Sequence, residues 1–141
     1  MGYHVSKMWH EILMSSSTEE DVLKYPELME CSPVEIQIII ITKTTPDLLL
    51  RDYVSMLHLP KSTLTSIINR LERKQFIKRV INQKDYRSYG LELDKKGLKF
   101  CELYMAYQRD MGNRIISGLN EDEKNQLSFL LNKISSYMVR R

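Results

Sequence analysis

Residues 61–94 constrain the fold of this chain most, because a helix pattern passes there directly into two strand patterns. Within residues 61–73, apolar side chains recur at the i, i+3, i+4 and i+7 positions that share one side of a helix. They are Leu64, Ile67, Ile68 and Leu71. Residues 76–81 and 89–94 then show the β-branched and aromatic residues and the alternation typical of strands. The segment therefore predicts a one-sided helix followed by a β-hairpin.

The outward face of the predicted helix is small, polar and basic. At about 100° per residue, the side chains directly opposite the apolar stripe are Ser62, Ser66, Asn69 and Arg73. Those on its flanks are Thr63, Thr65 and Arg70. Hydroxyls can contact bases or phosphates, an Asn amide suits adenine, and arginines reach guanine or phosphate, so the face fits a DNA major groove. A solvated surface with ordinary polar residues is the other interpretation.

Charge is distributed unevenly along the 141 residues. Residues 60–100 hold 11 Lys and Arg against 4 Asp and Glu, a balance of +7, and residues 1–59 hold 4 against 9, a balance of −5. A compact basic segment suits a polyanion-binding surface, although a solvated face would carry the same charge. The composition, with 43% hydrophobic and 28% charged residues, is that of an ordinary folded protein rich in helix.

Helical signals precede the basic segment. Residues 3–14 have an amphipathic pattern that ends at the serines of residues 15–17, and residues 18–21 can cap a further turn or two before Pro26. The isoleucines of residues 38–41 favour a strand by propensity. The capping pair of Ser32 and Glu35, with Pro33 in the first helical position, instead favours a buried helix over residues 33–43. Thr45 and Pro46 give the start signal of another helix, which runs to Leu57.

The C-terminal third is predicted to be helical again. The first helix extends over residues 95–117, with Cys101 on its apolar side. Asn120 and Glu123 form a capping pair that starts a second helix. Its apolar stripe is long enough to require a partner, and consists of Leu127, Leu130, Leu131, Ile134 and Met138.

Two helices, a tight turn, a third helix and a hairpin follow one another in the order of a winged helix-turn-helix. The stretch DYVSMLHLPKSTLTSIINRLERKQFIKR resembles the helix-turn-helix and first wing strand of the MarR family of transcriptional regulators. DYRSYGLELDKKG resembles the wing signature of that family, Asp-x-Arg followed by a strand and a helix start. The family usually has Gly where this chain has His58 and Gln75, so both residues are expected to adopt a positive φ. Val54 stands where a small Ala is common, which would set the two helices slightly farther apart.

The resemblance implies a mainly α fold with a small β-hairpin wing (α+β), in which residues 32–97 form the winged helix-turn-helix DNA-binding domain. Residues 1–31 and 98–141 would form the helical dimerisation region. Two copies would then place their recognition helices in successive major grooves of a pseudo-palindromic operator in double-stranded DNA. Arg87 at the wing tip would enter the minor groove, Asp85 would orient its guanidinium by a charge-assisted pair, and Lys84 would approach phosphates.

We therefore expect a dimeric, sequence-specific DNA-binding regulator, a repressor relieved by a small-molecule or redox signal. The expected DNA-binding residues of the recognition helix are Lys61, Ser62, Thr63, Thr65, Ser66, Asn69, Arg70 and Arg73. Those of the wing are Lys84, Asp85 and Arg87. The alternative is a winged-helix protein-interaction module without DNA binding, which would be expected to lack these basic residues.

Further expectations concern ligands and location. Cys31 precedes a helix N-terminus, where the dipole can lower a thiol pKa, so it is a possible redox residue, although a buried structural Cys is the more common case. Tyr3, Trp9, Tyr25 and Tyr53 could line a pocket for a small phenolic effector, or simply pack. We found no catalytic motif, no metal-ligand spacing and no cofactor motif, so no enzyme is expected. Without an apolar run that could cross a membrane or a secretory signal, a cytoplasmic protein is expected.

Overall fold

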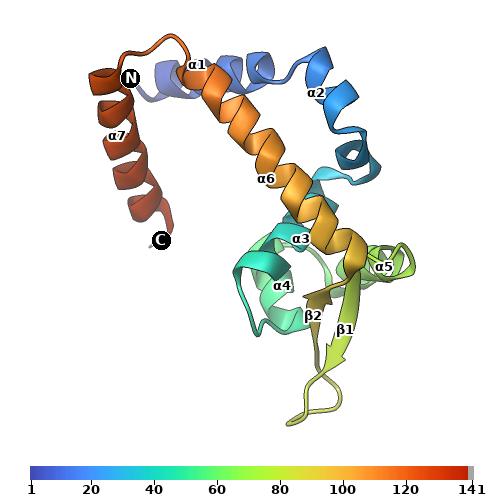
Figure 1. Cartoon of the computed structure of the whole chain (residues 1–141). Helices are drawn as coiled ribbons and strands as arrows, with labels where there is room; N and C mark the ends of the chain where they lie inside the picture. The colour runs from blue at the N-terminus through green and yellow to red at the C-terminus, as the bar shows by residue number, and fades with distance from the viewer. Residues whose placement is uncertain (140–141) are drawn as a thin grey trace. The chain divides into compact units, whose positions relative to one another are not determined.

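The computed structural model describes residues 1–139 (Figure 1). In chain order its elements are α1 (Gly2–Ser16), α2 (Glu19–Lys24), the short 3-10 helix η1 (Pro26–Glu30), α3 (Pro33–Thr44), α4 (Leu50–Leu57), α5 (Lys61–Arg73), β1 (Ile77–Ile81), β2 (Tyr89–Leu93), α6 (Lys95–Ile116) and α7 (Glu121–Val139). The predicted mainly helical fold with one hairpin is confirmed. None of the described helices has both the length and the apolar character needed to cross a membrane.

The chain divides into two compact units. The first, here called the wing unit, comprises residues 19–107. The second, the terminal unit, comprises residues 1–18 and the described residues from 108 onward. The division into dimerisation and DNA-binding regions drawn from the sequence is a functional one, and it stays a prediction. The last two residues of the predicted dimerisation region, 140 and 141, lie outside the described residues.

The core of the wing unit joins α3, α4, α5 and β1. The largest fully buried side chains, with exposed fractions of 1% or less, are Tyr53, Ile38, Ile39, Leu64, Ile68, Leu71 and Ile77. Three of these belong to the apolar stripe predicted for α5, whose fourth member, Ile67, is half-buried. Burying one such side chain contributes about 1.5–3 kcal/mol. The inner face of α5 is therefore fixed by the core, and its outer face is left to solvent.

The N-terminus of α3 has the capping box predicted from the sequence. The Ser32 hydroxyl accepts a hydrogen bond from the Glu35 amide at 3.3 Å, and the Glu35 carboxylate accepts one from the Ser32 amide at 3.1 Å. The isoleucine run is helical, as predicted, because the helix turns Ile38 and Ile39 into the core while capping satisfies its first amides. Local capping thus outweighs the strand propensity of the isoleucines.

The start of α4 corrects the sequence prediction. The helix begins at Leu50 rather than after Thr45 and Pro46, and the intervening Asp47 has a left-handed φ of 63°. Residues 45–47 form a bend and a turn, and Leu49 then forms a β-bridge with Gly90 of β2, so this part of the chain is not helical. The carboxylate of Asp52 accepts a hydrogen bond from the Leu49 amide at 2.8 Å and caps the helix at its actual start.

β1 and β2 form the predicted antiparallel hairpin, with Ile77 opposite Leu93 and Ile81 opposite Tyr89. The hairpin extends away from α3, α4 and α5, and its connecting loop is the outermost part of the wing unit (Figure 1). On its other side, β2 is held near the loop end of the hairpin by the bridge from Leu49 to Gly90, which lies opposite Val80. A Cβ atom at Gly90 would lie 2.8 Å from the Leu48 carbonyl oxygen, so the close approach requires glycine. The hairpin is thus anchored close to its connecting loop.

Residues with a left-handed backbone conformation precede and follow α5. His58, which ends α4, has a φ of 54°, and Gln75, which follows α5, has a φ of 67°. Both positive φ values are as predicted. They turn the chain sharply into and out of α5, at a cost of about 1–2 kcal/mol for most side chains in place of glycine.

The terminal unit contains α1, the end of α6 and α7. The Arg114 guanidinium donates two hydrogen bonds, at 2.9 and 3.2 Å, to the carbonyl oxygen of Ser16, which links α6 to the end of α1. At the start of α7, Asn120 and Glu123 exchange hydrogen bonds of 2.9 and 3.0 Å, as predicted. The apolar side chains of α1 and α7 remain largely exposed, among them Tyr3, Val5, Trp9, Phe129, Leu130 and Ile134. Single surface residues of this kind are ordinary, but two whole apolar stripes indicate a partner surface.

Candidate nucleic-acid interface

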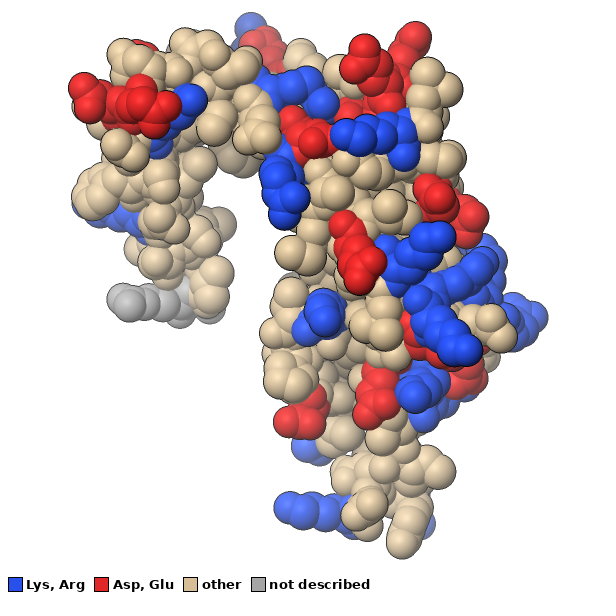
Figure 2. All heavy atoms as spheres, viewed as in Figure 1, with Lys and Arg blue, Asp and Glu red and all other residues tan. Residues whose placement is uncertain are grey.

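The predicted recognition residues lie on α5, and most of them are exposed. The exposed residues are Lys61, Ser62, Thr63, Ser66, Asn69, Arg70 and Arg73, whereas Thr65 is half-buried. Lys and Arg side chains gather over α5, β1 and the start of α6 in the space-filling view (Figure 2). The wing unit therefore has a cationic surface next to its hairpin, as the charge balance of residues 60–100 predicted.

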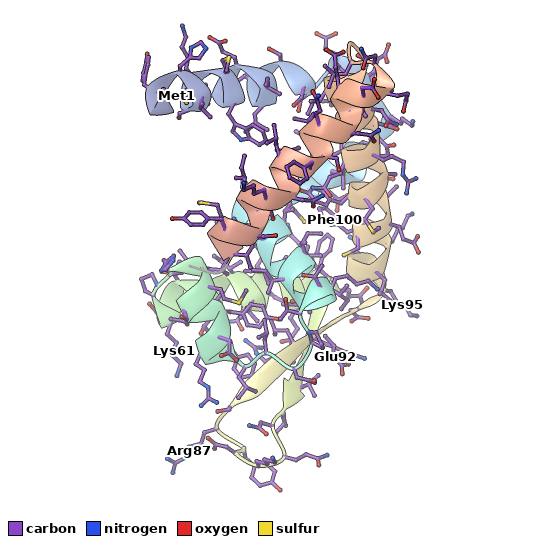
Figure 3. All side chains as sticks on the ribbon, turned by 90° about the vertical axis from the view of Figure 1, so that its left-hand side faces the viewer. Met1, Lys61, Arg87, Glu92, Lys95 and Phe100 are labelled. Carbon is purple, nitrogen blue, oxygen red and sulfur yellow. The ribbon has the colours of Figure 1, made fainter. Side chains whose placement is uncertain are left out.

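Lys61 and Arg87 mark the two ends of this surface. Lys61 begins α5, and Arg87 lies in the loop between β1 and β2. Figure 3 shows both at the lower side of the wing unit, where the hairpin extends. The helix and the loop thus present cations on one side of the same unit, which is the arrangement that contacts to a major groove and the neighbouring minor groove require.

Arg70 is held on one flank of α5. Its guanidinium lies 3.2 Å from the Glu35 carboxylate, whose side chain is only 5% exposed. Glu35 thus serves both the capping box of α3 and an ion pair with α5. Its other carboxylate oxygen is buried and has no hydrogen-bond partner within the described residues. Removing Arg70 would leave a buried carboxylate without its cation, so this arginine fixes α5 on α3 as well as contributing charge.

Asn69 is held on the other flank by Arg79 of β1. The Arg79 guanidinium donates to the Asn69 side-chain oxygen and, at 2.6 Å, to the Glu72 carboxylate. The Arg79 amide also donates to Glu72, at 3.2 Å, and the guanidinium lies 5.0 Å from the centre of the Tyr89 ring. Sequence reasoning missed Arg79. The available signal was a cation in the middle of the strand that follows the recognition helix.

In the hairpin loop, Lys84, Asp85 and Arg87 are all exposed. Asp85 corrects the sequence prediction. Its carboxylate accepts hydrogen bonds from the Arg87 amide at 3.0 Å and from the Ser88 hydroxyl at 3.3 Å. Within residues 1–139 the structure has no ion pair between Asp85 and the Arg87 guanidinium. A side-chain acceptor two residues before an amide closes a local turn, so Asp85 shapes the loop backbone and leaves the guanidinium extended toward solvent.

Cys31 is buried, which is the more common of the two cases expected for it, and its redox role stays a prediction. Burial, with a smaller effect of the neighbouring Glu35, raises the pKa of the Cys31 thiol to about 11. The helix dipole does not lower it, because the thiol is buried and lies beside a carboxylate. Cys101, on the apolar side of α6, is buried as predicted, and burial raises its pKa as well. Both thiols are therefore protonated near neutral pH and poorly suited to react with oxidants.

The four aromatic residues considered for an effector pocket fall into the two units. Tyr25 and Tyr53 belong to the core of the wing unit, where the Tyr53 hydroxyl lies 2.9 Å from the Thr42 hydroxyl. Tyr3 and Trp9 are exposed on α1 of the terminal unit. Packing explains Tyr25 and Tyr53, and the pocket stays a prediction. Among the described residues, no three His, Cys, Asp or Glu side chains gather as metal ligands would.

The sequence comparisons agree with this geometry. The model of the MarR family matches residues 32–89. The HTH-type transcriptional regulator PecS of Dickeya dadantii is 29% identical over 86 residues, which are 61% of this chain and 52% of PecS. The uncharacterized HTH-type transcriptional regulator YkoM of Bacillus subtilis is 31% identical over 102 residues, 72% of this chain and 66% of YkoM. The matches thus span about half of PecS and just under two thirds of YkoM.

The fold is similar to solved structures over nearly the whole chain. A crystal structure of MarR gives a TM-score of 0.72 at 18% identity and covers 97% of this chain and 98% of its own. A crystal structure of a complex of MepR from S. aureus with DNA gives 0.63 at 21% identity and covers 96% of each chain. At these identities the likeness concerns the fold, a winged helix-turn-helix with additional terminal helices.

Proposed function

Because this chain belongs to the MarR family of transcriptional regulators, we propose that it binds an operator in double-stranded DNA as a homodimer and represses transcription until a small molecule releases it. The family consists of regulators rather than enzymes, in agreement with the prediction that this chain is not an enzyme.

One observation carries the proposal: α5 presents an exposed polar and cationic face beside the exposed cationic tip of the hairpin. The opposite face of the helix supplies Leu64, Ile68 and Leu71 to the core, none of which has any exposed surface. The outer face is therefore available to a ligand without loss of core contacts. The complex of MepR with DNA, which has a similar fold, supports DNA as that ligand.

In the proposed complex, α5 lies in the major groove and the hairpin loop reaches the adjacent minor groove. Ser62, Ser66 and Arg73 on the outer face of α5 contact base edges and phosphates, while Lys61 contacts the backbone. Arg87 enters the minor groove from a loop whose backbone Asp85 holds, and Lys84 neutralises a phosphate. Each phosphate contact releases a counterion, so affinity should fall steeply with salt concentration.

The proposed dimer uses the terminal helices. The apolar stripes of α1 and α7 are exposed in the single chain and would be removed from water by a second copy. A symmetric pair presents two recognition helices, which is why the proposed operator is pseudo-palindromic.

We propose a small molecule as the releasing signal because the neutral thiols of Cys31 and Cys101 do not favour a redox signal. A phenolic compound remains our proposed effector class.

The proposal is tested by enriching bound duplexes from a random pool at low ionic strength, followed by gel-shift titration of the selected site at two salt concentrations. We expect a site with two related half-sites about one helical turn apart, or a multiple of that distance. Protein that selects no duplex under these conditions would contradict the proposal and favour a protein-interaction module.

A further inference from the structure

Arg79 connects the hairpin to the outer face of α5 through several contacts at once. Its guanidinium donates to both Glu72 and Asn69, its amide donates to Glu72, and its planar group lies over the ring of Tyr89. The Arg79 side chain is 28% exposed. A guanidinium with three such partners has little rotational freedom, so the groups it contacts are held as well.

These contacts fix which end of the Asn69 amide faces the hairpin. An Arg side chain has five N–H donors and no acceptor, so only the oxygen of an amide can face it. The Asn69 oxygen thus faces Arg79 and has one of its two lone pairs engaged, and the amide nitrogen, with its two N–H donors, lies on the side away from the guanidinium. The reversed amide would set its N–H donors against those of the guanidinium.

The orientation matters because the bases differ in what they offer in the major groove. Adenine presents one acceptor and one donor, and bidentate recognition by Asn needs both ends of the amide. Guanine presents two acceptors, N7 and O6, and thymine presents the acceptor O4. Cytosine presents the donor N4. An Asn whose oxygen is already bound to a guanidinium is suited to guanine or thymine, and less suited to adenine.

We propose that Arg79 is a positioning residue for base recognition: it orients the Asn69 amide with its nitrogen outward, so that Asn69 reads an acceptor, on guanine or thymine, instead of adenine. This inference rests on the proposed DNA binding. It replaces the preference for adenine that the sequence alone predicts for an exposed Asn on this helix.

The first test releases the amide without changing the net charge. In the double variant Arg79→Met with Glu72→Met, both the donor to Asn69 and the nearby carboxylate are absent. The matched control is Lys78→Met with Glu92→Met, which removes a cross-strand ion pair of 3.7 Å on the same hairpin. Duplexes are enriched from a random pool with the wild type, both double variants and Asn69→Ala, and the position that relaxes in Asn69→Ala identifies the base that Asn69 reads.

We expect the wild type and the control to enrich guanine or thymine at that position. The Arg79→Met, Glu72→Met variant should shift it toward adenine by about tenfold, the size of one bidentate base contact, and leave the other positions unchanged. Adenine at this position in the wild type, or an unchanged preference in the variant, would overturn the inference while DNA binding itself stands. A wild type that enriches no sequence would overturn the proposed function, and this inference with it.

A second variant keeps the test valid if the double variant does not fold. Asn69→Asp changes an exposed side chain, and one carboxylate oxygen can still accept from Arg79. The other oxygen then faces the groove as an acceptor, which suits the N4 donor of cytosine. A shift to cytosine at the same position supports the inference, and retention of the wild-type base contradicts it.

Discussion

The charged residues around α5 have two different roles: some hold other side chains in place, and others are exposed to a ligand. Glu35 and Arg79 lie beneath or beside the helix and hold Arg70 and Asn69 in place. Arg73 and Arg87 are exposed and can neutralise phosphates. A count of basic residues treats these roles alike, although only the second kind adds directly to the salt dependence of binding.

Replacing Arg87 with Ala should weaken operator binding by about 1–3 kcal/mol and reduce the slope of log affinity against log salt by about one. The guanidinium is exposed, and Asp85 bonds to the backbone of the loop, so the loop should keep its shape without it. Gel-shift titration at two salt concentrations measures both quantities. Gln83→Ala, which changes an uncharged residue of the same loop, is the control. Equal affinities of the two variants for the operator would show that Arg87 does not contact the DNA.

Cys31 should react slowly with iodoacetamide in the folded protein at pH 8, because burial raises its pKa from 9.0 to about 11 and the thiol remains protonated. The rate should rise between pH 9 and pH 11, whereas in urea-unfolded protein the rise should centre near pH 9. Folding favours the protonated thiol, so the associated stability is complete below pH 9 and is lost as the pH rises through 11. Peptide mass spectrometry distinguishes alkylation of Cys31 from that of Cys101. If the alkylation rate of Cys31 in the folded protein reached half its maximum below pH 9, Cys31 would be a reactive thiol after all.

At the scale of elements, the sequence predicts best what depends on neighbours along the chain. The capping pairs that start α3 and α7, the apolar stripe of α5 and the alternation of both strands follow from local rules, and all are present in the structure. The start of α4 was predicted too early because the bridge between Leu49 and Gly90 joins distant segments. The contact of Asn69 with Arg79 escaped for the same reason, since propensity and periodicity do not include tertiary partners.

The junction between the hairpin and α6 offers a test of packing. A Cβ atom at Gly97 would lie 2.1 Å from the Phe76 carbonyl oxygen, which also accepts a hydrogen bond from the Asp94 amide at 2.9 Å. Gly97→Ala should therefore lower the free energy of unfolding by about 1–3 kcal/mol, as measured by urea denaturation. Gly118→Ala, where a Cβ meets nothing within 4 Å, should change it by less than about 0.5 kcal/mol. Equal midpoints for the two variants would show that α6 can shift to make room.

At the scale of the whole molecule, the two units differ in how completely they are folded by themselves. The wing unit has a core from which solvent is excluded, whereas α7 contributes no buried residue within Glu121–Val139. Its apolar stripe is largely exposed in the single chain. A second copy would supply the missing contacts, and the stability of the terminal unit should then depend on protein concentration.

The variant Ile134→Glu should convert the proposed dimer into a monomer, because a carboxylate in an apolar interface has a desolvation cost of several kcal/mol. Sedimentation velocity at micromolar concentration measures the change. Ser136→Glu adds the same charge to the opposite face of α7 and should leave the dimer intact. If Ile134→Glu sediments like the wild type, α7 does not form the dimer interface.

The left-handed backbone at His58 and Gln75 has a consequence for mutational tolerance. Both side chains are exposed, so most substitutions there would be expected to have little effect. Their positive φ values reverse that expectation: glycine and asparagine should be accepted, and valine or isoleucine rejected. In a saturation library screened for folding, these two surface positions should tolerate as few residue types as core positions do. The rejected residue types would then mark the two ends of α5.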